Sequence, residues 1–164
     1  MPSVRSDVVV NTGPVLALTA AGYLHVLRDL FTKITIPYEV VREIEAGGQT
    51  QFARDEFRAA SWMDKRSMSV SVSPLLQSTL DPGEAAVVAL ATAEQIATVA
   101  IDETVGRRIA RLHGLTVTGS LGVLIRAKKQ GVQIRLRTAI ERMRQQGIWL
   151  SDALEKECLR LAGE

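Results

Sequence analysis

The sequence contains one cysteine and two histidines among its 164 residues. The single thiol, Cys158, excludes a disulfide framework and a thiolate metal site, and it fits a reducing compartment. His25 and His113 stand apart on expected helices, so we expect neither to bind a metal. The longest uninterrupted apolar run, residues 85–91, is far shorter than the ~20 residues that cross a membrane, and no signal peptide is visible. We therefore expect a cytoplasmic protein with no membrane partner.

Nucleotide-binding signatures are also missing. Neither a phosphate loop nor a GxGxxG motif follows the first expected strand. Internal repeats, low-complexity tracts and linker-like stretches are absent as well. A chain of this length, with 46% hydrophobic and 23% charged residues, is typical of one globular domain. We expect residues 1–164 to form a single domain.

Charge is distributed unevenly along the chain. The net charge is only +2, but residues 104–148 hold ten Lys and Arg against one acid, which gives this segment +9, while residues 1–103 carry −5. A basic segment beside acidic residues fits a polyanion that is brought to a cation site. Solvated helix faces explain the same charges equally well, so charge alone leaves both interpretations open.

The hydrophobic pattern predicts an α/β fold. Continuous or alternating apolar residues predict five strands, at residues 7–10, 33–36, 68–72, 97–101 and 115–118. Helical spacing and capping residues predict helices between and after them, at residues 15–20, 23–30, 37–47, 49–60, 82–93, 104–113, 119–130, 136–146 and 151–162. Because the first and fourth strands are wholly apolar, we expect a five-stranded, mostly parallel sheet with these strands inside and the third and fifth at its edges.

Polar or acidic side chains stand at the ends of several predicted strands. Asn11 follows the first strand, and Asp102 and Glu103 follow the fourth. Glu43 and Glu84 lie on helices expected near the same edge. In open α/β sheets this edge is the usual ligand site. Oxygen ligands without histidines or thiols suit Mg²⁺ or Mn²⁺, ions that can activate water and stabilise a phosphodiester during hydrolysis.

Each of these residues also has a purely structural interpretation. Glu84 occupies the position of a capping-box glutamate, and Asn11 and Asp102 are natural helix caps. Glu43 fits a solvated helix position. For any one residue the structural role is the more frequent one. Several carboxylates in one crevice would repel one another, however, and a bound cation relieves that repulsion.

Six segments of the chain resemble the PIN-domain family. They are VVVNTGPVLAL, IPYEVVREI, LDPGEAAVVALA, AIDETVGRRIARLHGL, TGSLGVLIRAKKQG and WLSDAL. The resemblance is closest to a bacterial and archaeal branch described as nucleic-acid-binding proteins and related to VapC-type toxins. It implies a three-layer α/β/α PIN-like fold, an acidic cluster that holds Mg²⁺ or Mn²⁺, and endoribonuclease activity on single-stranded RNA.

The resemblance also assigns site residues. Asn11 stands where the family's first aspartate usually lies, Glu43 and Glu84 match the acids of two helices, and the acid after the fourth strand falls on Asp102 or Glu103. An asparagine can bind a metal through its amide oxygen but brings no negative charge. We therefore expect weaker metal affinity and a less well-activated water than with aspartate.

Two further sets of residues belong to this expectation. Thr12 and Ser120 match small hydroxyl residues that line the family's site. Basic residues expected to position the RNA backbone are Arg107, Arg108, Arg126, Lys128 and Lys129.

Three functions remain open from the sequence. The first is a metal-dependent ribonuclease in which a metal-bound water attacks the phosphorus, with the toxin of a toxin–antitoxin pair as its more specific form. Its expected metal ligands are Asn11, Glu84, Asp102 and Glu103. The second is a non-catalytic or weakly active nucleic-acid-binding module, because Asn11 replaces an acid. The third is an interaction protein that uses its C-terminal helices as a contact surface. The family resemblance adds an antitoxin and a second copy of the chain as expected partners.

Overall fold

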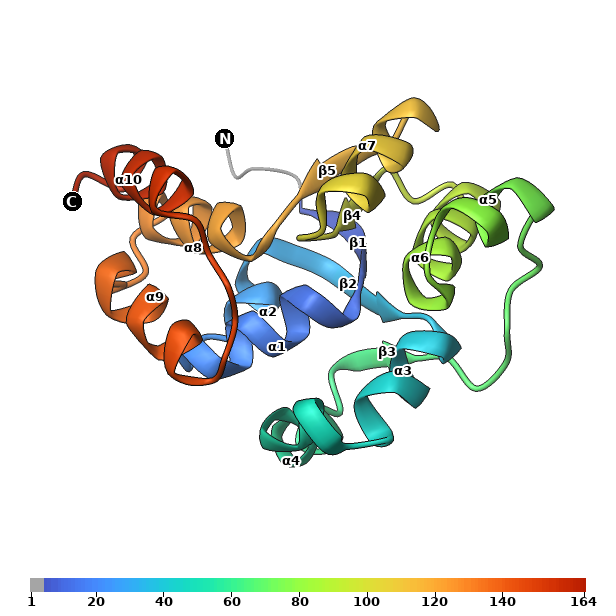
Figure 1. Ribbon diagram of the computed structural model, residues 1–164, viewed down its shortest axis with the longest axis horizontal. Helices are drawn as coiled ribbons and strands as arrows, with labels where there is room; N and C mark the ends of the chain where they lie inside the picture. The colour runs from blue at the N-terminus through green and yellow to red at the C-terminus, as the bar shows by residue number, and fades with distance from the viewer. Residues whose placement is uncertain (1–4) are drawn as a thin grey trace.

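The computed structural model describes residues 5–164 (Figure 1). Five strands are formed: β1 (Ser6–Val10), β2 (Phe31–Ile36), β3 (Met63–Lys65), β4 (Thr98–Ala100) and β5 (Thr116–Thr118). The helices are α1 (Thr12–Ala21), α2 (Val26–Leu30), α3 (Tyr38–Glu45), the 3₁₀ turn η1 (Gly48–Thr50), α4 (Gln51–Ala59), α5 (Pro74–Thr79), α6 (Pro82–Ala93), α7 (Thr104–Leu112), α8 (Ser120–Lys129), α9 (Leu136–Gln145) and α10 (Asp152–Leu161).

The strands form one parallel sheet in the order β3-β2-β1-β4-β5. Val9 in β1 is the register partner of Thr35 in β2 and of Val99 in β4, and all three are fully buried. This confirms the prediction of a five-stranded sheet with the first and fourth strands inside and the third and fifth at the edges. Parallel strands place all their carboxyl ends at one edge, which is where α1, α3, α7 and α8 begin.

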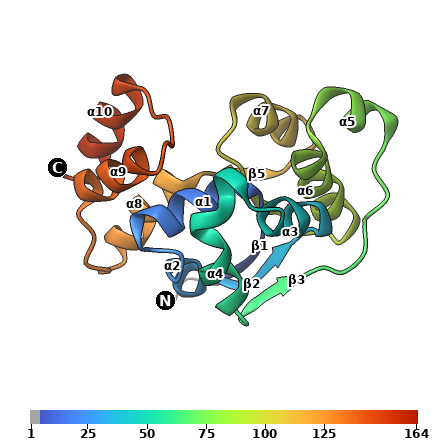
Figure 2. The same cartoon turned by 60° about the horizontal axis from the view of Figure 1, so that its bottom comes forward.

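Helices cover the sheet and pack on one another in groups (Figures 1 and 2). The α1 helix contacts α3, α4, α8 and α9, whereas α6 contacts β1 and β4 and has α5 and α7 as neighbours. Nine of the twelve residues of α6 are buried, as its nearly continuous apolar sequence predicts. None of the helices within residues 5–164 is long and apolar enough to cross a membrane.

The predicted position of the third strand, residues 68–72, is wrong. The strand is Met63–Lys65, and only Met63 of its three residues is buried. Asp64 in this strand forms ion pairs with Lys33 and Arg66, so the edge is polar and carries little hydrophobic signal. The alternation that predicted a strand at 68–72 has another origin, because Val70 and Val72 pack on the core from a segment outside the sheet.

Three helices also differ clearly from the prediction. The first begins at Thr12 rather than residue 15. The second helix begins at Val26 rather than residue 23. The short α5 helix was not predicted, although Ser73 and Pro74 mark its start: the Ser73 hydroxyl accepts a hydrogen bond from the Leu76 amide at 3.3 Å. At six residues, α5 is too short to show a helical apolar period.

Candidate functional site

The first two candidate residues lie where β1 passes into α1. The Asn11 amide donates a hydrogen bond to the Ala100 carbonyl of β4 at 3.0 Å, which fixes the end of β1 beside the end of β4. Asn11 occupies the N-cap position of α1, but its side chain makes no capping hydrogen bond. Its buried Oδ1 has no hydrogen-bond partner among residues 5–164. An acceptor left in this state is costly unless something outside the chain binds it.

The oxygens of three elements converge on Gly83, in the first turn of α6. A Cβ atom built on Gly83 would lie 3.2 Å from Asn11 Oδ1, 3.2 Å from Glu43 Oε2 and 3.6 Å from Asp81 Oδ1. Glu43 is held in this position because its Oε2 accepts a hydrogen bond from the Thr12 hydroxyl at 2.7 Å. Glycine at position 83 therefore leaves room for oxygens from the α1 cap, from α3 and from the α6 cap around one point.

Asp81 is a residue that the sequence analysis treated only as a helix cap. It is one: its Oδ1 accepts a hydrogen bond from the Glu84 amide at 2.8 Å. The same carboxylate also faces the group at Gly83 and acts on Glu84 electrostatically. The LDPGEA segment signals the cap, but only the fold shows that this cap faces Asn11 and Glu43.

Glu84 is buried next to this group, with 5% of its surface exposed. Burial, followed by the negative charges of Asp81, Glu103 and Glu43, raises the pKa of Glu84 to about 7. Its side chain packs against Gly106 at the start of α7, where an added Cβ would lie 3.2 Å from the Glu84 Cδ. Glu84 is thus a carboxyl group that changes charge near neutral pH in a setting that disfavours its charged form.

The raised pKa of Glu84 predicts a pH-dependent effect on stability. The folded state holds this proton more tightly than the unfolded state does. The free energy of unfolding therefore falls as the pH rises from about 4.5 to about 7. Glutamine does not titrate. We therefore expect the change in the free energy of unfolding caused by Glu84→Gln to be more stabilising at pH 8 than at pH 4.5, by about 1 kcal/mol or more. Urea denaturation of both proteins in metal-free buffer at the two pH values measures this difference. An effect that is the same at both would show that Glu84 titrates normally.

Asp102 and Glu103, the two alternatives after β4, have different surroundings. Glu103 caps α7, because its Oε2 accepts hydrogen bonds from the Val105 amide at 2.9 Å and the Gly106 amide at 3.1 Å. Asp102 Oδ1 instead accepts a hydrogen bond from the Ser120 amide at 2.7 Å, at the start of α8. Glu103 is therefore engaged within its own helix, whereas Asp102 links β4 to the next helix.

The Asp102 carboxylate lies beside the start of α1. Cβ atoms built on Gly13 and Gly119 would lie 3.8 Å from its Oδ2 and 2.7 Å from its Oδ1, respectively. The residue as a whole is exposed, yet the protein atoms around its carboxylate displace hydration and raise the pKa of Asp102, and hydrogen bonds from Ser120 and the charge of Arg107 oppose that shift. Asp102 thus lies beside Gly13, two residues after Asn11 in the chain.

The predicted basic residues fall into two sets. Arg107 and Arg108 lie on α7, and Arg107 donates a hydrogen bond to the Ile101 carbonyl at 2.8 Å, beside Asp102. The remaining three lie toward the far end of α8, whose ten residues carry them roughly 10 Å or more from Ser120. There Lys128 pairs with Glu164 at 2.8 Å, and the Arg126 guanidinium lies 5.3 Å from the centre of the Phe31 ring. Only the α7 arginines are at the edge of the sheet where the acids are.

The residues at this edge fit a hard cation in their chemistry. They supply amide and carboxylate oxygens, and the unpartnered Asn11 Oδ1 is one of them. The pKa of Glu84 is a second sign, since burial and then the charges of Asp81, Glu103 and Glu43 hold it high, and a bound cation would oppose both effects. Within residues 5–164, no three acidic, histidine or cysteine side chains gather closely enough to form a ready-made metal site. A cation would therefore depend on the Asn11 amide and on small movements of the acids.

Comparison with known proteins identifies the family. The family model DUF3368, described as a PIN domain, matches residues 7–164. The chain belongs to the PIN-domain family, which has a nuclease-type fold and in general binds nucleic acid with the help of divalent metals. No curated protein and no solved structure matches the chain. The VapC-like subtype and the single-domain organisation of residues 1–164 stay predictions.

Proposed function

We propose that the protein is a metal-dependent endoribonuclease that hydrolyses phosphodiester bonds of single-stranded RNA. The observation that carries the proposal is that Asn11 Oδ1 and Glu43 Oε2 each lie 3.2 Å from the position of a Cβ built on Gly83, beside the buried Glu84. In this proposal Asn11, Glu84 and Asp102 hold Mg²⁺ or Mn²⁺, and Glu43 and Asp81 complete the negative field around it. A bound Mg²⁺ or Mn²⁺ would supply positive charge at the phosphodiester and lower the pKa of water.

The chain's own residues have distinct tasks in this proposal. Glu84 has a pKa of about 7 in the metal-free protein, so a bound cation would displace its proton and keep the carboxylate charged at neutral pH. The Thr12 hydroxyl orients Glu43, and the Ser120 amide orients Asp102, so neither carboxylate has to be ordered when substrate arrives. Arg107 and Arg108 contact the RNA backbone at the site, while Arg126, Lys128 and Lys129 contact only RNA that extends along α8.

Cleavage assays test this function directly. We expect a 5′-labelled single-stranded RNA to be cut by the purified protein with Mn²⁺ or Mg²⁺ and to stay intact in EDTA. Double-stranded RNA of the same sequence should be cut far more slowly. The absence of cleavage at any divalent ion concentration would contradict the proposal.

A toxin role is the more specific form of the same proposal. It rests on the likeness of this branch to VapC-type toxins, and it would bring an antitoxin as a protein partner. A homodimer is part of the same proposal, and the exposed Trp149, 83% accessible, offers apolar surface that a second chain could cover. Growth arrest on expression, relieved by the product of a neighbouring gene, tests the toxin role.

A non-catalytic nucleic-acid-binding module is the second candidate. The neutral Asn11 at the position of an acid favours it, as does the lack of three clustered acids in the part of the chain that the structure describes. Such a module would bind RNA in EDTA with a strong dependence on salt and would not cleave it.

Asn11→Asp distinguishes the two candidates. A carboxylate adds charge to the oxygen that faces Glu43, so we expect Mn²⁺ affinity to rise on the order of tenfold. For a ribonuclease, wild type cleaves and the variant needs less Mn²⁺; for a binding module, only the variant cleaves. Isothermal titration with Mn²⁺ and the cleavage assay measure the two effects. Unchanged Mn²⁺ affinity would show that Asn11 does not contact the metal.

A further inference from the structure

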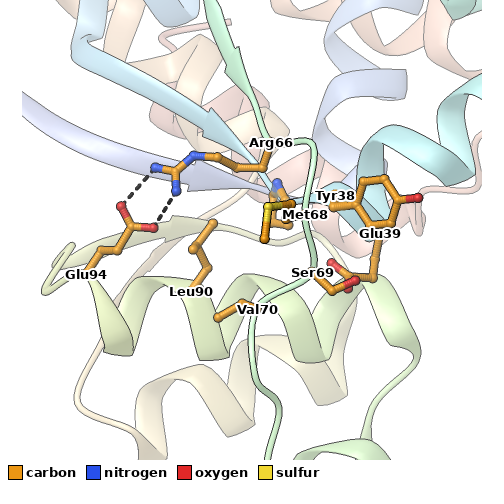
Figure 3. Close-up of a pocket in the computed structure, with 9 residues that line it drawn as sticks. Tyr38, Glu39, Arg66, Met68, Ser69, Val70, Leu90 and Glu94 are labelled. Atoms are coloured by element: carbon orange, nitrogen blue, oxygen red, sulfur yellow. Dashed lines mark hydrogen bonds and ion pairs between the residues drawn. The ribbon is translucent and has the colours of Figure 1, made fainter.

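A groove lies between α3, α6 and the segment from Arg66 to Val72 that runs from β3 toward α5 (Figure 3). It consists of two hollows of about 200 and 420 Å³ that share Glu39, Ser69 and Val70 in their walls. The larger hollow has the size of a small-ligand site. Its remaining walls are mostly apolar and are formed by Val72, Gln77, Leu80, Pro82 and Ala85.

Glu39 gives this apolar groove an unmatched charge. Its Oε2 is buried and has no hydrogen-bond partner among residues 5–164. The one basic residue in the walls, Arg66, is already engaged, because it pairs with Glu94 at 2.6 Å and with Asp64 at 3.0 Å (Figure 3). A ligand that fits must therefore have an apolar surface for the walls and hydrogen-bond donors for the Glu39 carboxylate.

The groove lies next to the candidate site along α3 and α6. Glu39 and Glu43 are four residues apart on α3, so they lie on the same face, about 6 Å apart along the helix axis. Pro82, in the groove wall, directly precedes Gly83, over which Asn11 and Glu43 meet. A nucleotide whose phosphate lies at Glu43 would thus bring its base to the groove.

We propose that this groove binds the base of a nucleotide next to the cleaved phosphate, and that the preferred base is guanine. The inference rests on the proposed ribonuclease function and names the specificity of the same site. Guanine presents two adjacent donors, N1–H and N2–H, which match the two oxygens of one carboxylate. Uracil presents one N–H between two carbonyls, and adenine and cytosine present one amino group beside an acceptor nitrogen, so their acceptors face the carboxylate unfavourably.

Two neighbours of Glu39 complete the fit. The Ser69 side chain lies beside Glu39 in the groove, where its hydroxyl can donate to the guanine O6 (Figure 3). Leu80 and Pro82 offer flat apolar contact for the face of an unstacked base, which is how single-stranded RNA is commonly recognised.

Binding measured without metal tests the specificity independently of cleavage. Fluorescence anisotropy in EDTA would compare the labelled heptamers UUUGUUU, UUUAUUU, UUUCUUU and UUUUUUU on wild type, Glu39→Gln and Glu56→Gln. Glu56 is an exposed glutamate on α4, away from the groove, and serves as the matched control. We expect the guanine heptamer to bind about tenfold more tightly than the others to wild type and Glu56→Gln, and Glu39→Gln to reduce that preference to about twofold or less.

The outcomes separate this inference from the proposed function. A guanine preference that depends on Glu39 supports the inference even if no RNA is cleaved. Cleavage without any base preference would overturn the inference and leave the ribonuclease proposal intact. Equal binding of all four heptamers would overturn it, and so would a guanine preference that survives Glu39→Gln. A change in the self-association of Glu39→Gln without a base preference would also overturn it, because it would assign the groove to a protein contact.

Discussion

Replacement of Glu84 by glutamine is expected to reduce Mn²⁺-dependent cleavage of single-stranded RNA by a factor on the order of 10²–10³. The substitution keeps the shape of a side chain that is 95% buried at the start of α6 but removes its charge. It thereby removes both a metal ligand and the group that ionises near neutral pH. Initial rates at saturating Mn²⁺, with RNA in excess, measure the loss.

The controls for Glu84→Gln exclude unfolding as its cause. The variant is expected to be at least as stable as wild type at pH 8, because glutamine relieves the repulsion from Asp81, Glu103 and Glu43. Glu56→Gln, on the exposed side of α4, should cleave like wild type. Equal cleavage by wild type and Glu84→Gln would contradict the assignment of Glu84 to the site.

Substitution of Gly83 by alanine is expected to lower cleavage by about 10–100-fold without loss of stability. The new Cβ would lie 3.2 Å from both Asn11 Oδ1 and Glu43 Oε2, so the two oxygens must move away from it. The required shift is a few tenths of an ångström, and because a misplacement of about 1 Å at a reacting centre can cost about 10²-fold in rate, we expect a loss nearer the lower end of this range. Alanine at a helical position meanwhile favours folding by up to about 1 kcal/mol.

Gly122→Ala provides the matched control for Gly83→Ala. Gly122 is also a helical glycine, in α8, and its added Cβ would meet the Thr118 hydroxyl at 3.1 Å rather than the oxygens at Gly83. Cleavage rates and thermal melting of both variants should show a fall in rate for Gly83→Ala alone. If Gly83→Ala cleaved as fast as wild type, the approach of Asn11 and Glu43 over Gly83 would have no role in catalysis.

The sheet and most helices could be predicted because their signals are local. The apolar residues of β1 and α6 predict that these elements are buried. Asp81 and Pro82 mark the start of a helix that begins at Pro82 in the structure. β3 could not be predicted, because a three-residue edge strand is held by its pairing with β2 and by ion pairs of Asp64, and neither leaves a period in the sequence.

The candidate site was only partly accessible from the sequence. Strand order predicts that residues after β1 and β4 lie at one edge, and the family resemblance adds Glu43 and Glu84. The roles of side chains within that edge depend on contacts between distant segments. The choice of Glu103 as the cap of α7, and the contact of Thr12 with Glu43, arise from such geometry.

The basic residues show the same limit of sequence reasoning. A count of charges along the sequence treats Arg107 and Lys128 alike, because it does not include the direction of the helix that carries each residue. In the structure α8 carries Lys128 away from the acids and toward Glu164, while Arg107 remains beside Asp102. We therefore expect neutralisation of Arg107 to weaken RNA binding more than neutralisation of Lys128.

The central claim is that Asn11 after β1, Glu84 in α6 and Asp102 after β4 together bind one divalent cation, and that Glu43 of α3 adds negative charge beside it. The most direct test is isothermal titration of the metal-free protein with Mn²⁺ at pH 8. It compares wild type, Glu84→Gln and Glu56→Gln. The account predicts a binding site in wild type and Glu56→Gln that is weakened at least about tenfold in Glu84→Gln. Equal Mn²⁺ binding by all three proteins, or no binding by wild type at millimolar Mn²⁺, would contradict it.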